Sequence, residues 1–199
     1  MSQAPHSPRF ADTFAAAHPL AQRLIGRLAN DAGARILEIG TGSGRNTRAL
    51  RDAGFSVVTI NDARFASPDA PAAGADFAAA ISTHALLHGD SETVAHATRR
   101  IAWALKPGAW LYGTFGSSRD ARFGQGQRID DCTFAPLQGD ERGVPHVYFN
   151  ERRLRALLEP YFGVESLEEH DVDRVAGSWA HRERPLSGAV HWFATARRR

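Results

Sequence analysis

The sequence contains a single cysteine, Cys132, a single methionine and a single lysine, Lys106. One cysteine cannot form a disulfide within the chain, which fits a reducing compartment. No run approaches the roughly 20 apolar residues that span a bilayer, and the first residues lack the basic and apolar regions of a signal peptide. We therefore expect a soluble, cytoplasmic protein with no membrane partner.

A strong excess of charge of one sign is also missing. The formal net charge is +2 at pH 7, and the arginines are scattered along the chain except for the final three residues. This distribution does not indicate a nucleic-acid-binding surface, so we expect no nucleic-acid partner. The 199 residues, 43% of them hydrophobic, suffice for one domain with a sizeable core.

Short β-rich runs alternate with helical stretches, which is the pattern of an α/β fold with a mostly parallel sheet. The predicted strands are residues 35–39, 55–62, 76–84 and 109–116, followed by an antiparallel pair at 164–172 and 189–197. The predicted helices are residues 19–30, 45–54, 91–105 and 150–162. The expected single domain, 1–199, then consists of an N-terminal helical segment (1–33), a half with the glycine turn (34–116), a long connection (117–149) and a C-terminal helix with two strands (150–199).

Three glycines follow the first predicted strand, in the stretch RILEIGTGSGRN. At a turn from strand to helix, glycines let backbone N–H groups come close to a ligand. A phosphate-binding P-loop would need Gly-Lys-Ser/Thr, which GRNT does not supply. A dinucleotide-binding turn has the form G-x-G-x-x-G/A, whereas Gly40, Gly42 and Gly44 form G-x-G-x-G. Neither phosphate-binding pattern is therefore matched.

Two carboxylates near this turn restrict the class of ligand further. Glu38 would repel a pyrophosphate and attract a ligand that carries ammonium and sulfonium charges, as S-adenosylmethionine does. Asp62, at the end of the second predicted strand, can accept hydrogen bonds from both ribose hydroxyls of an adenosine ligand. NAD shares the ribose, so Asp62 indicates adenosine, and Glu38 favours S-adenosylmethionine over NAD.

Four stretches in this order, LEIGTGSGRNTRAL, VVTIND, AAAISTHALLH and ALKPGAWLYGTF, resemble the class I S-adenosylmethionine-dependent methyltransferases, in the branch of small soluble enzymes. The resemblance covers roughly residues 34–116. It implies a Rossmann-like, doubly wound, mostly parallel sheet with an antiparallel last strand and S-adenosylmethionine as cofactor. It also implies a set of cofactor-binding residues, namely Glu38, Gly40, Thr41, Gly42, Gly44, Asn46, Asp62, Ser82, Thr83 and His84.

The sequence departs from the family pattern after the second strand. Only about a dozen residues separate Asp62 from the next predicted strand, where the family places a helix and a further strand. We therefore expect this region to be shortened. The acidic residue that faces adenine in the family has no clear counterpart, with Asp69 and Asp76 as the candidates.

Methyl transfer is an in-line displacement, so catalysis consists of positioning and, for some acceptors, removal of a proton. The candidate bases are His84 and His88 after the third strand, where ligands of open α/β sheets bind, and His146 in the long connection. His84 and His88 have the i, i+4 spacing of half a zinc site, but no third ligand is evident in the sequence. We therefore expect no metal.

The connection from Ser117 to Phe149 is polar and rich in glycine, and we expect a loop that covers the acceptor. Its arginines, among them Arg119, Arg122 and Arg128, have two interpretations: contacts to an anionic acceptor, or ion pairs with acids such as Asp120.

The acceptor class follows by exclusion. The chain lacks the Asn/Asp-Pro-Pro-aromatic run of enzymes that methylate DNA bases and the clustered carboxylates of metal-dependent catechol methyltransferases. We therefore expect methyl transfer to a small-molecule acceptor. Two alternatives remain open: a protein that binds S-adenosylmethionine or S-adenosylhomocysteine without transferase activity, and, more distantly, an NAD-dependent oxidoreductase.

Overall fold

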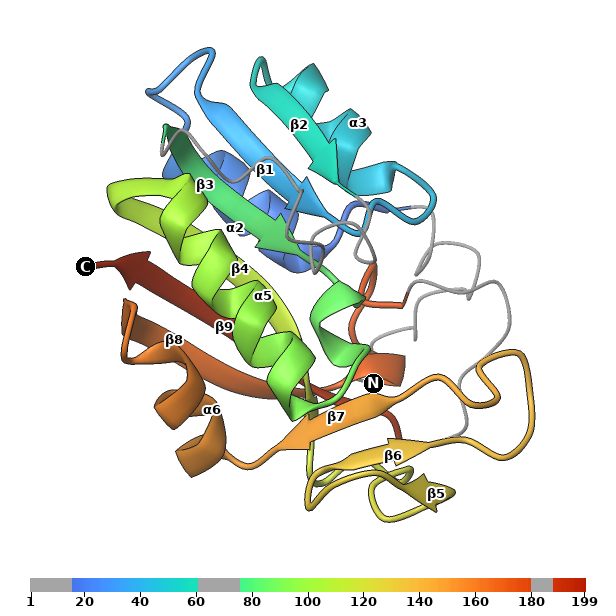
Figure 1. Ribbon diagram of the computed structural model, residues 1–199. Helices are drawn as coiled ribbons and strands as arrows, with labels where there is room; N and C mark the ends of the chain where they lie inside the picture. Colours follow the sequence, from blue (N-terminus) through green and yellow to red (C-terminus); the bar gives the residue numbers. More distant parts are fainter. Residues whose placement is uncertain (1–15, 61–75, 180–187) are drawn as a thin grey trace, which may run out of the picture.

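The computed structural model describes residues 16–60, 76–179 and 188–199, and a twisted β-sheet forms its centre (Figure 1). The strands of the main sheet lie in the order β2 (Ser56–Ile60), β1 (Arg35–Ile39), β3 (Phe77–Ser82), β4 (Leu105–Ser117), β9 (Val190–Arg198) and β8 (Phe162–Asp171). The first four strands are parallel, and β9 is antiparallel to both of its neighbours. The predicted Rossmann-like sheet with an antiparallel last strand is confirmed.

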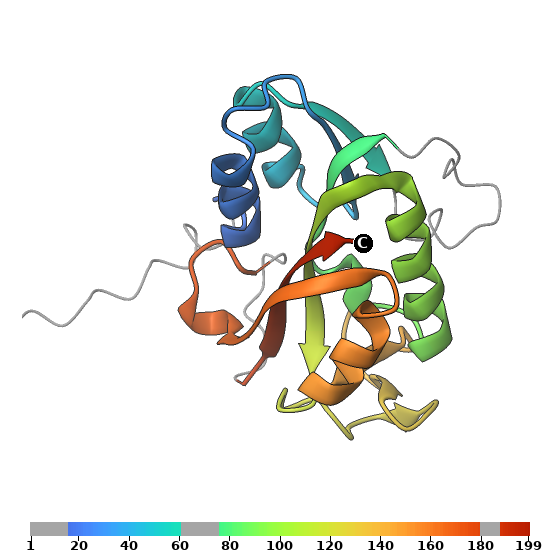
Figure 2. The same cartoon turned by 90° about the vertical axis from the view of Figure 1, so that its left-hand side faces the viewer.

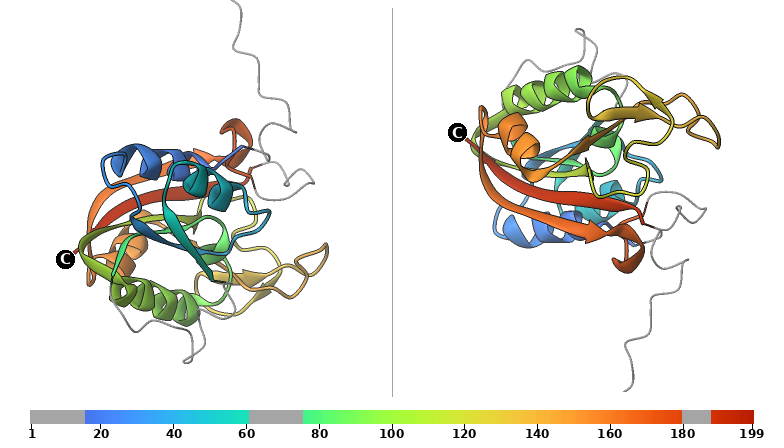
Figure 3. Two further views of the ribbon diagram at one scale, coloured as in Figure 1. Left: turned by 90° about the horizontal axis from the view of Figure 1, so that it is seen from above. Right: turned by 90° about the horizontal axis from the view of Figure 1, so that it is seen from below.

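Helices cover both faces of this sheet. α2 (Pro19–Arg27) and α3 (Arg45–Asp52) lie on one face, and α5 (Ser91–Ala104) and α6 (Glu151–Leu158) lie on the other (Figures 2 and 3). On β3, Ile81 packs with the α2 side, whereas Ala80 packs with the α5 side. A parallel strand buried on both faces is apolar throughout, which explains the run FAAAIS. No helix in the described ranges is long and apolar enough to span a membrane.

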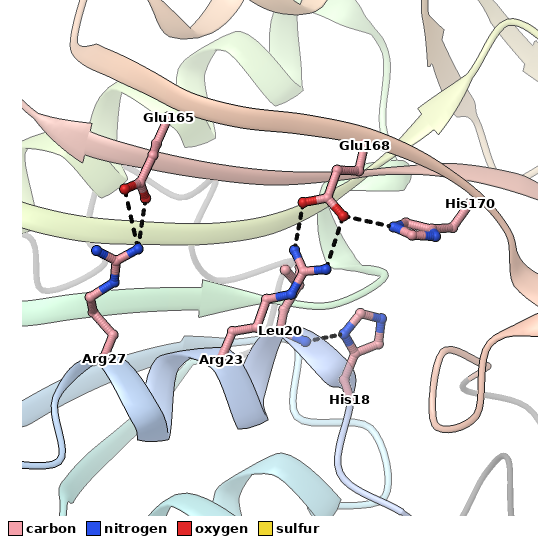
Figure 4. A network of polar contacts seen from close by, with 7 residues as sticks. All are labelled: His18, Leu20, Arg23, Arg27, Glu165, Glu168 and His170. Carbon is pink, nitrogen blue, oxygen red and sulfur yellow. Dashed lines mark hydrogen bonds and ion pairs between the residues drawn. The ribbon is translucent and has the colours of Figure 1, made fainter.

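Helix α2 is attached to strand β8 by two ion pairs (Figure 4). Arg23 donates to both carboxylate oxygens of Glu168 at 2.8 and 2.9 Å, and Arg27 donates to those of Glu165 at 3.2 and 3.0 Å. Because all four side chains are partly solvated, each pair adds little stability. The pairs connect β8 to α2, the helix whose N-cap is His18.

Strand β4 begins at Leu105, four residues earlier than the sequence pattern predicts. Pro107 lacks an N–H, and Gly108 has a positive φ of 77°, so this stretch resembles a turn in sequence. The structure accommodates both residues at a register shift between the pairs of Phe77 and Ala79 with β4. Irregularities of this kind let proline and glycine occur within a strand.

The connection from Ser117 to Phe149, which the sequence predicts as a loop, includes short strands. The segment contains β5 (Gln127–Arg128), β6 (Thr133–Ala135) and β7 (His146–Phe149), which form an antiparallel β5–β6–β7 unit. Gly116 of β4 pairs with a residue of β7 and also with one of β9, so these strands flank opposite edges of β4. The β5–β6–β7 unit therefore continues the β3 side of β4, beyond the carboxyl end of β3. Such short strands give too few alternating residues for the sequence to indicate them.

Candidate active site

The three glycines after β1 form the predicted turn, with φ angles of 74°, 49° and 74° at Gly40, Gly42 and Gly44. They differ in what a side chain would meet. A Cβ atom at Gly40 would lie 2.5 Å from the Cβ of Ala85, whereas one at Gly42 or Gly44 would meet no described atom within 4 Å. Gly40 is therefore required for packing against the turn after β3. Gly42 and Gly44 are required for the left-handed backbone, which leaves the outer side of the turn bare.

Glu38 lies on β1 two residues before Gly40, and it is only 1% exposed. Its Oε2 accepts a hydrogen bond from the hydroxyl of Thr47 on α3, and its Oε1 has no partner among the described residues. Burial raises the pKa of this carboxyl group, and the hydrogen bond from Thr47 acts in the opposite direction. A buried carboxylate with one oxygen available is well suited to a positively charged ligand group.

Asn46, predicted to contact the cofactor, uses both ends of its amide within the protein. Its Oδ1 accepts from the backbone N–H of His18 at 2.8 Å, and its Nδ2 donates to the hydroxyl of Thr83 at 2.9 Å. Asn46 therefore connects the start of α2 to the end of β3. This geometry makes it a positioning residue for His18 and Thr83.

The end of β3 has an unusual backbone at His84. Its φ of 74° is the only positive value of a non-glycine residue in the described ranges. Its N–H donates to the hydroxyl of Thr114 on β4 at 2.7 Å, which holds this conformation. The neighbouring Ser82 is fully buried, and its hydroxyl has no hydrogen-bond partner in the described part of the chain. Strained backbone and unpaired buried groups of this kind concentrate at functional sites.

His84 belongs to a cluster of buried rings. Its ring centroid lies 6.0 Å from that of His18, 5.4 Å from that of His191 and 6.1 Å from that of Trp179. The Nδ1 of His18 accepts the N–H of Leu20, while His18 Nε2 and His191 Nδ1 have no partner among the described residues. Burial is the main cause that lowers the pKa of both rings, that of His191 to about 3. Both rings are therefore neutral at pH 7.

Sequence analysis did not identify His18. The residue precedes Pro19, the first residue of the predicted helix, and its ring is the N-cap of α2. Histidine followed by proline was the only local signal, and it indicates a helix start rather than a functional group. The ring becomes part of the cluster only because α2 packs across the sheet.

His88 and His146, two predicted bases, lie together in a second cluster with Glu141. The Nε2 atoms of the two histidines lie 3.5 and 3.2 Å from oxygens of Glu141. The sequence suggested His84 and His88 as a pair, but the structure places them in different clusters. Glu141 was not predicted, because it comes from the turn before β7 and nothing local in the sequence connects it to His88.

The glycine turn, the buried acid and the histidines lie at the carboxyl edge of a Rossmann-like sheet, and a family comparison identifies this arrangement. The profile of a family described as a methyltransferase domain matches residues 12–161, well over half of the chain. The chain belongs to this methyltransferase family. It is an S-adenosylmethionine-dependent methyltransferase with S-adenosylmethionine as its cofactor. The NAD-dependent alternative is thereby set aside.

Solved structures share the fold of this methyltransferase at low sequence identity. The 1,6-didemethyltoxoflavin-N1-methyltransferase of Burkholderia thailandensis, solved with 1,6-didemethyltoxoflavin and S-adenosylhomocysteine, is 18% identical with a TM-score of 0.64, covering 95% of this chain and 80% of that one. A methyltransferase from Methanosarcina mazei is 19% identical with a TM-score of 0.61, covering 82% and 91%. One from Mesorhizobium loti is 19% identical with a TM-score of 0.56, covering 89% and 96%. No curated protein matches the chain in sequence.

The residues of this methyltransferase fit the cofactor of its family. The bare turn at Gly42 and Gly44 leaves room for a ligand beside the backbone, and the surface next to it is hollowed by about 470 Å³, with Thr41 and Thr47 in its lining. The available oxygen of Glu38 matches an ammonium group. A phosphate-bearing cofactor would place negative charge against that carboxylate.

Three acidic residues were predicted to contact the adenosine of the cofactor, and the structure describes only one of them. Asp62 and Asp69 lie outside the described residues. Asp76 pairs with Arg35, the first residue of β1, at the amino end of the strands. The glycine turn follows the opposite, carboxyl end of β1, so Asp76 is not an adenine contact. The region after β2 that the sequence predicts to be shortened also lies outside the described residues.

Three arginines of the connection from Ser117 to Phe149 are engaged within the methyltransferase. Arg122 forms two hydrogen bonds with the buried Asp120, at 2.8 and 2.7 Å. Arg119 pairs with Glu169, and Arg128 pairs with Asp131. Of the two interpretations, the structure supports ion pairs with acids.

Another hollow, of about 700 Å³, is lined by residues of α5, α6 and the stretch before β6, and by none of the glycine turn. Asp130, an acidic residue of this lining, accepts hydrogen bonds from Ser91, Cys132 and Thr133. These bonds attach β6 to the start of α5. We assign Asp130 a structural role, because its oxygens already have partners.

Proposed function

We propose that this methyltransferase methylates a small-molecule acceptor that binds between the glycine turn and the β5–β6–β7 unit. The observation that carries the proposal is the buried cluster of His18, His84 and His191. The rings of His18 and His191 are neutral, His84 lies two residues beyond Ser82, where β3 ends, and the buried hydroxyl of Ser82 has no partner among the described residues. An enclosed set of polar groups can orient a small ligand by a few hydrogen bonds.

The proposed cofactor site lies on one side of this cluster. Glu38 receives the ammonium group, the backbone from Gly40 to Gly44 lies along the methionine portion, and Ser82 and Thr83 face the sulfur. Asp62 is the proposed ribose ligand. When bound, the cofactor supplies a methyl group on a positively charged sulfur, and the residues of this chain contribute position and charge.

Two further observations support a small acceptor. Several described arginines are paired with carboxylates, as in the Arg23–Glu168 and Arg119–Glu169 pairs, so their charge is engaged within the protein and not available to the phosphates of a nucleic acid. The Burkholderia enzyme, which matches 95% of this chain in fold, was solved with a small heterocycle bound. That likeness extends to fold alone, and the acceptor of this chain is a separate question.

His84 is the proposed base for an acceptor that must lose a proton. Its ring lies among neutral imidazoles at the end of β3, and the strained backbone directs it into the cluster. His88 and His146 belong to the second cluster, farther along the acceptor side, and we propose that they contact the acceptor's distal portion. An acceptor that is already nucleophilic would need no base.

The test is turnover of S-adenosylmethionine with a panel of small oxygen, nitrogen and sulfur nucleophiles, read by formation of S-adenosylhomocysteine and of the methylated product. Parallel samples contain transfer RNA, duplex DNA and an unfolded protein. We expect a product from the small-molecule panel only. Methylation confined to a macromolecule would refute the proposal, and tight cofactor binding without any turnover would support the non-catalytic alternative.

The role of His84 has a matched control. His84→Gln is expected to lower kcat at least tenfold with a cofactor dissociation constant changed less than about threefold, because a base acts on the acceptor. His96→Gln changes a histidine of α5 that lies outside both clusters, and it should leave kcat unchanged. Equal kcat values in the two variants would remove His84 from the chemistry.

A further inference from the structure

Backbone hydrogen bonds bring the two histidines of the second cluster, His88 and His146, next to each other. His88 follows the short helix after β3, and His146 is the first residue of β7. The two residues form an isolated antiparallel bridge, and the N–H of Gly89 donates to the carbonyl of Pro145 at 2.9 Å. The two rings consequently lie 4.9 Å apart, nearly perpendicular to each other. Glu141 reaches both rings from the turn that precedes β7.

The three side chains direct their ligand atoms toward one point. His88 Nε2 lies 3.5 Å from Glu141 Oε1, and His146 Nε2 lies 3.2 Å from Glu141 Oε2. One ligand atom from each residue can be chosen so that all lie within 4.8 Å of one another. Donors bound tetrahedrally at 2.0–2.1 Å from a zinc ion lie about 3.3 Å apart. The observed spacing therefore needs only small side-chain movements to hold an ion.

The tautomer of His146 is an independent observation. Its Nδ1 lies 2.8 Å from the carbonyl oxygen of Val144, which can only accept, so Nδ1 carries a proton. In the neutral ring, the lone pair is then on Nε2, directed at a carboxylate oxygen 3.2 Å away. Two facing lone pairs repel each other unless a proton or a metal ion lies between them. A backbone carbonyl that fixes the ligating nitrogen in this way is the usual outer partner of a metal-bound histidine.

We propose that His88, Glu141 and His146 form a binding site for a divalent transition-metal ion of the zinc type. Two imidazoles and one carboxylate suit zinc, cobalt, nickel or ferrous iron, whereas magnesium and calcium prefer oxygen ligands alone. The His146 side chain is 6% exposed, and those of His88 and Glu141 are 28% and 32% exposed. The site is thus closed on one side and leaves a coordination position accessible on the other.

The inference goes beyond methyl transfer, because ion binding by these residues does not depend on the identity of the acceptor. The same chain also contains a comparison pair. His170 Nε2 lies 3.2 Å from Glu168 Oε2 on β8, the same separation as in the His146–Glu141 pair. It belongs to no described group of three potential metal ligands. An ordinary histidine–glutamate contact should bind no ion.

The experiment titrates zinc ions alone into the full-length chain after removal of bound metal by a chelator, with calorimetry as the readout. We expect one equivalent to bind with a dissociation constant of about 1 µM or tighter. Glu141→Gln should weaken binding at least tenfold, because the amide loses the charge that the ion requires. His170→Asn, the matched control, should bind as the wild type does. Magnesium ions should give no binding at this site.

A second variant and a spectroscopic probe distinguish the loss of a metal ligand from a folding defect. His88→Gln alters the more exposed of the two histidines, and far-ultraviolet circular dichroism verifies that each variant is folded. Cobalt ions report the geometry, since a four-coordinate cobalt site absorbs visible light strongly and the signal should be absent in both variants. Zinc binding that is absent in the wild type, or equally tight in the wild type and in both folded variants, overturns the proposal.

Discussion

At the scale of single residues, the glycines after β1 serve two separate purposes. Gly40 lacks a side chain because Ala85 occupies the adjacent space, and Gly42 lacks one because of its backbone conformation. Glu38, two residues before the turn, is buried with one oxygen available to a ligand. Packing and ligand binding therefore constrain neighbouring positions of the same short motif.

Gly42→Ala tests the ligand-binding part of this distinction. The new methyl group meets no described protein atom, so beyond backbone strain of about 1–2 kcal/mol the protein itself tolerates it. We expect the dissociation constant for S-adenosylhomocysteine, measured by calorimetry, to rise at least tenfold. Gly33→Ala is the control, since it has a φ of 79° and equally open surroundings. It should lose similar stability and bind the cofactor normally. Normal binding by a folded Gly42→Ala would contradict the proposed cofactor site.

At the scale of elements, one buried acid attaches the segment between β4 and the β5–β6–β7 unit to the main sheet. Asp120 accepts hydrogen bonds from Arg122 and from the N–H of Val190 at the start of β9. Its side chain is fully buried, and that of Arg122 is 21% exposed. The segment before β5 is thereby attached to β9, an interior strand of the main sheet.

Asp120→Ala should lower the free energy of unfolding by about 3–5 kcal/mol, because it leaves a largely buried guanidinium without its partner. Asp131→Ala is the matched control: it removes an acid whose pair with Arg128 is mostly exposed, and the loss should be within about 1 kcal/mol. Urea denaturation of both variants measures the difference. Equal losses would show that the segment before β5 is not anchored through Asp120.

At the scale of the whole molecule, the buried histidines make stability depend on pH. Burial, followed by the charge of Arg122, lowers the pKa of His191 to about 3, whereas a histidine in an unfolded chain has a pKa of about 6.5. Between about pH 6.5 and pH 3, His191 binds a proton in the unfolded chain and not in the folded chain. The contribution of His191 to the free energy of unfolding is therefore constant above about pH 6.5 and decreases as the pH falls toward 3.

His191→Gln isolates this contribution from that of the carboxylates. Between about pH 6 and pH 4, wild-type stability should decrease more steeply than that of the variant, by up to about 1.4 kcal/mol per pH unit. Urea unfolding at several pH values gives both slopes. Identical slopes would mean that His191 does not remain neutral in the folded protein.

Features specified by neighbouring residues could be predicted from the sequence. Alternation of apolar runs and helical periods indicated the sheet and its helices, and the stretch from Glu38 to Gly44 indicated the cofactor class. Both signals lie within a few residues, because a strand, a helix or a glycine turn is defined by its own backbone. The β5–β6–β7 unit escaped prediction because its pairing partners, and not its own short strands, determine its structure.

The sequence by itself thus determined the Rossmann-like sheet, the glycine turn and the methyltransferase family. Only the tertiary structure decided which histidines lie together. His84 joins His18 and His191 because α2 and β9 both pack near the end of β3, and His88 joins Glu141 and His146 because β7 extends the β3 edge of β4. These residues are far apart along the chain. No local pattern can encode such a distance, because chain reversals and strand pairing set it.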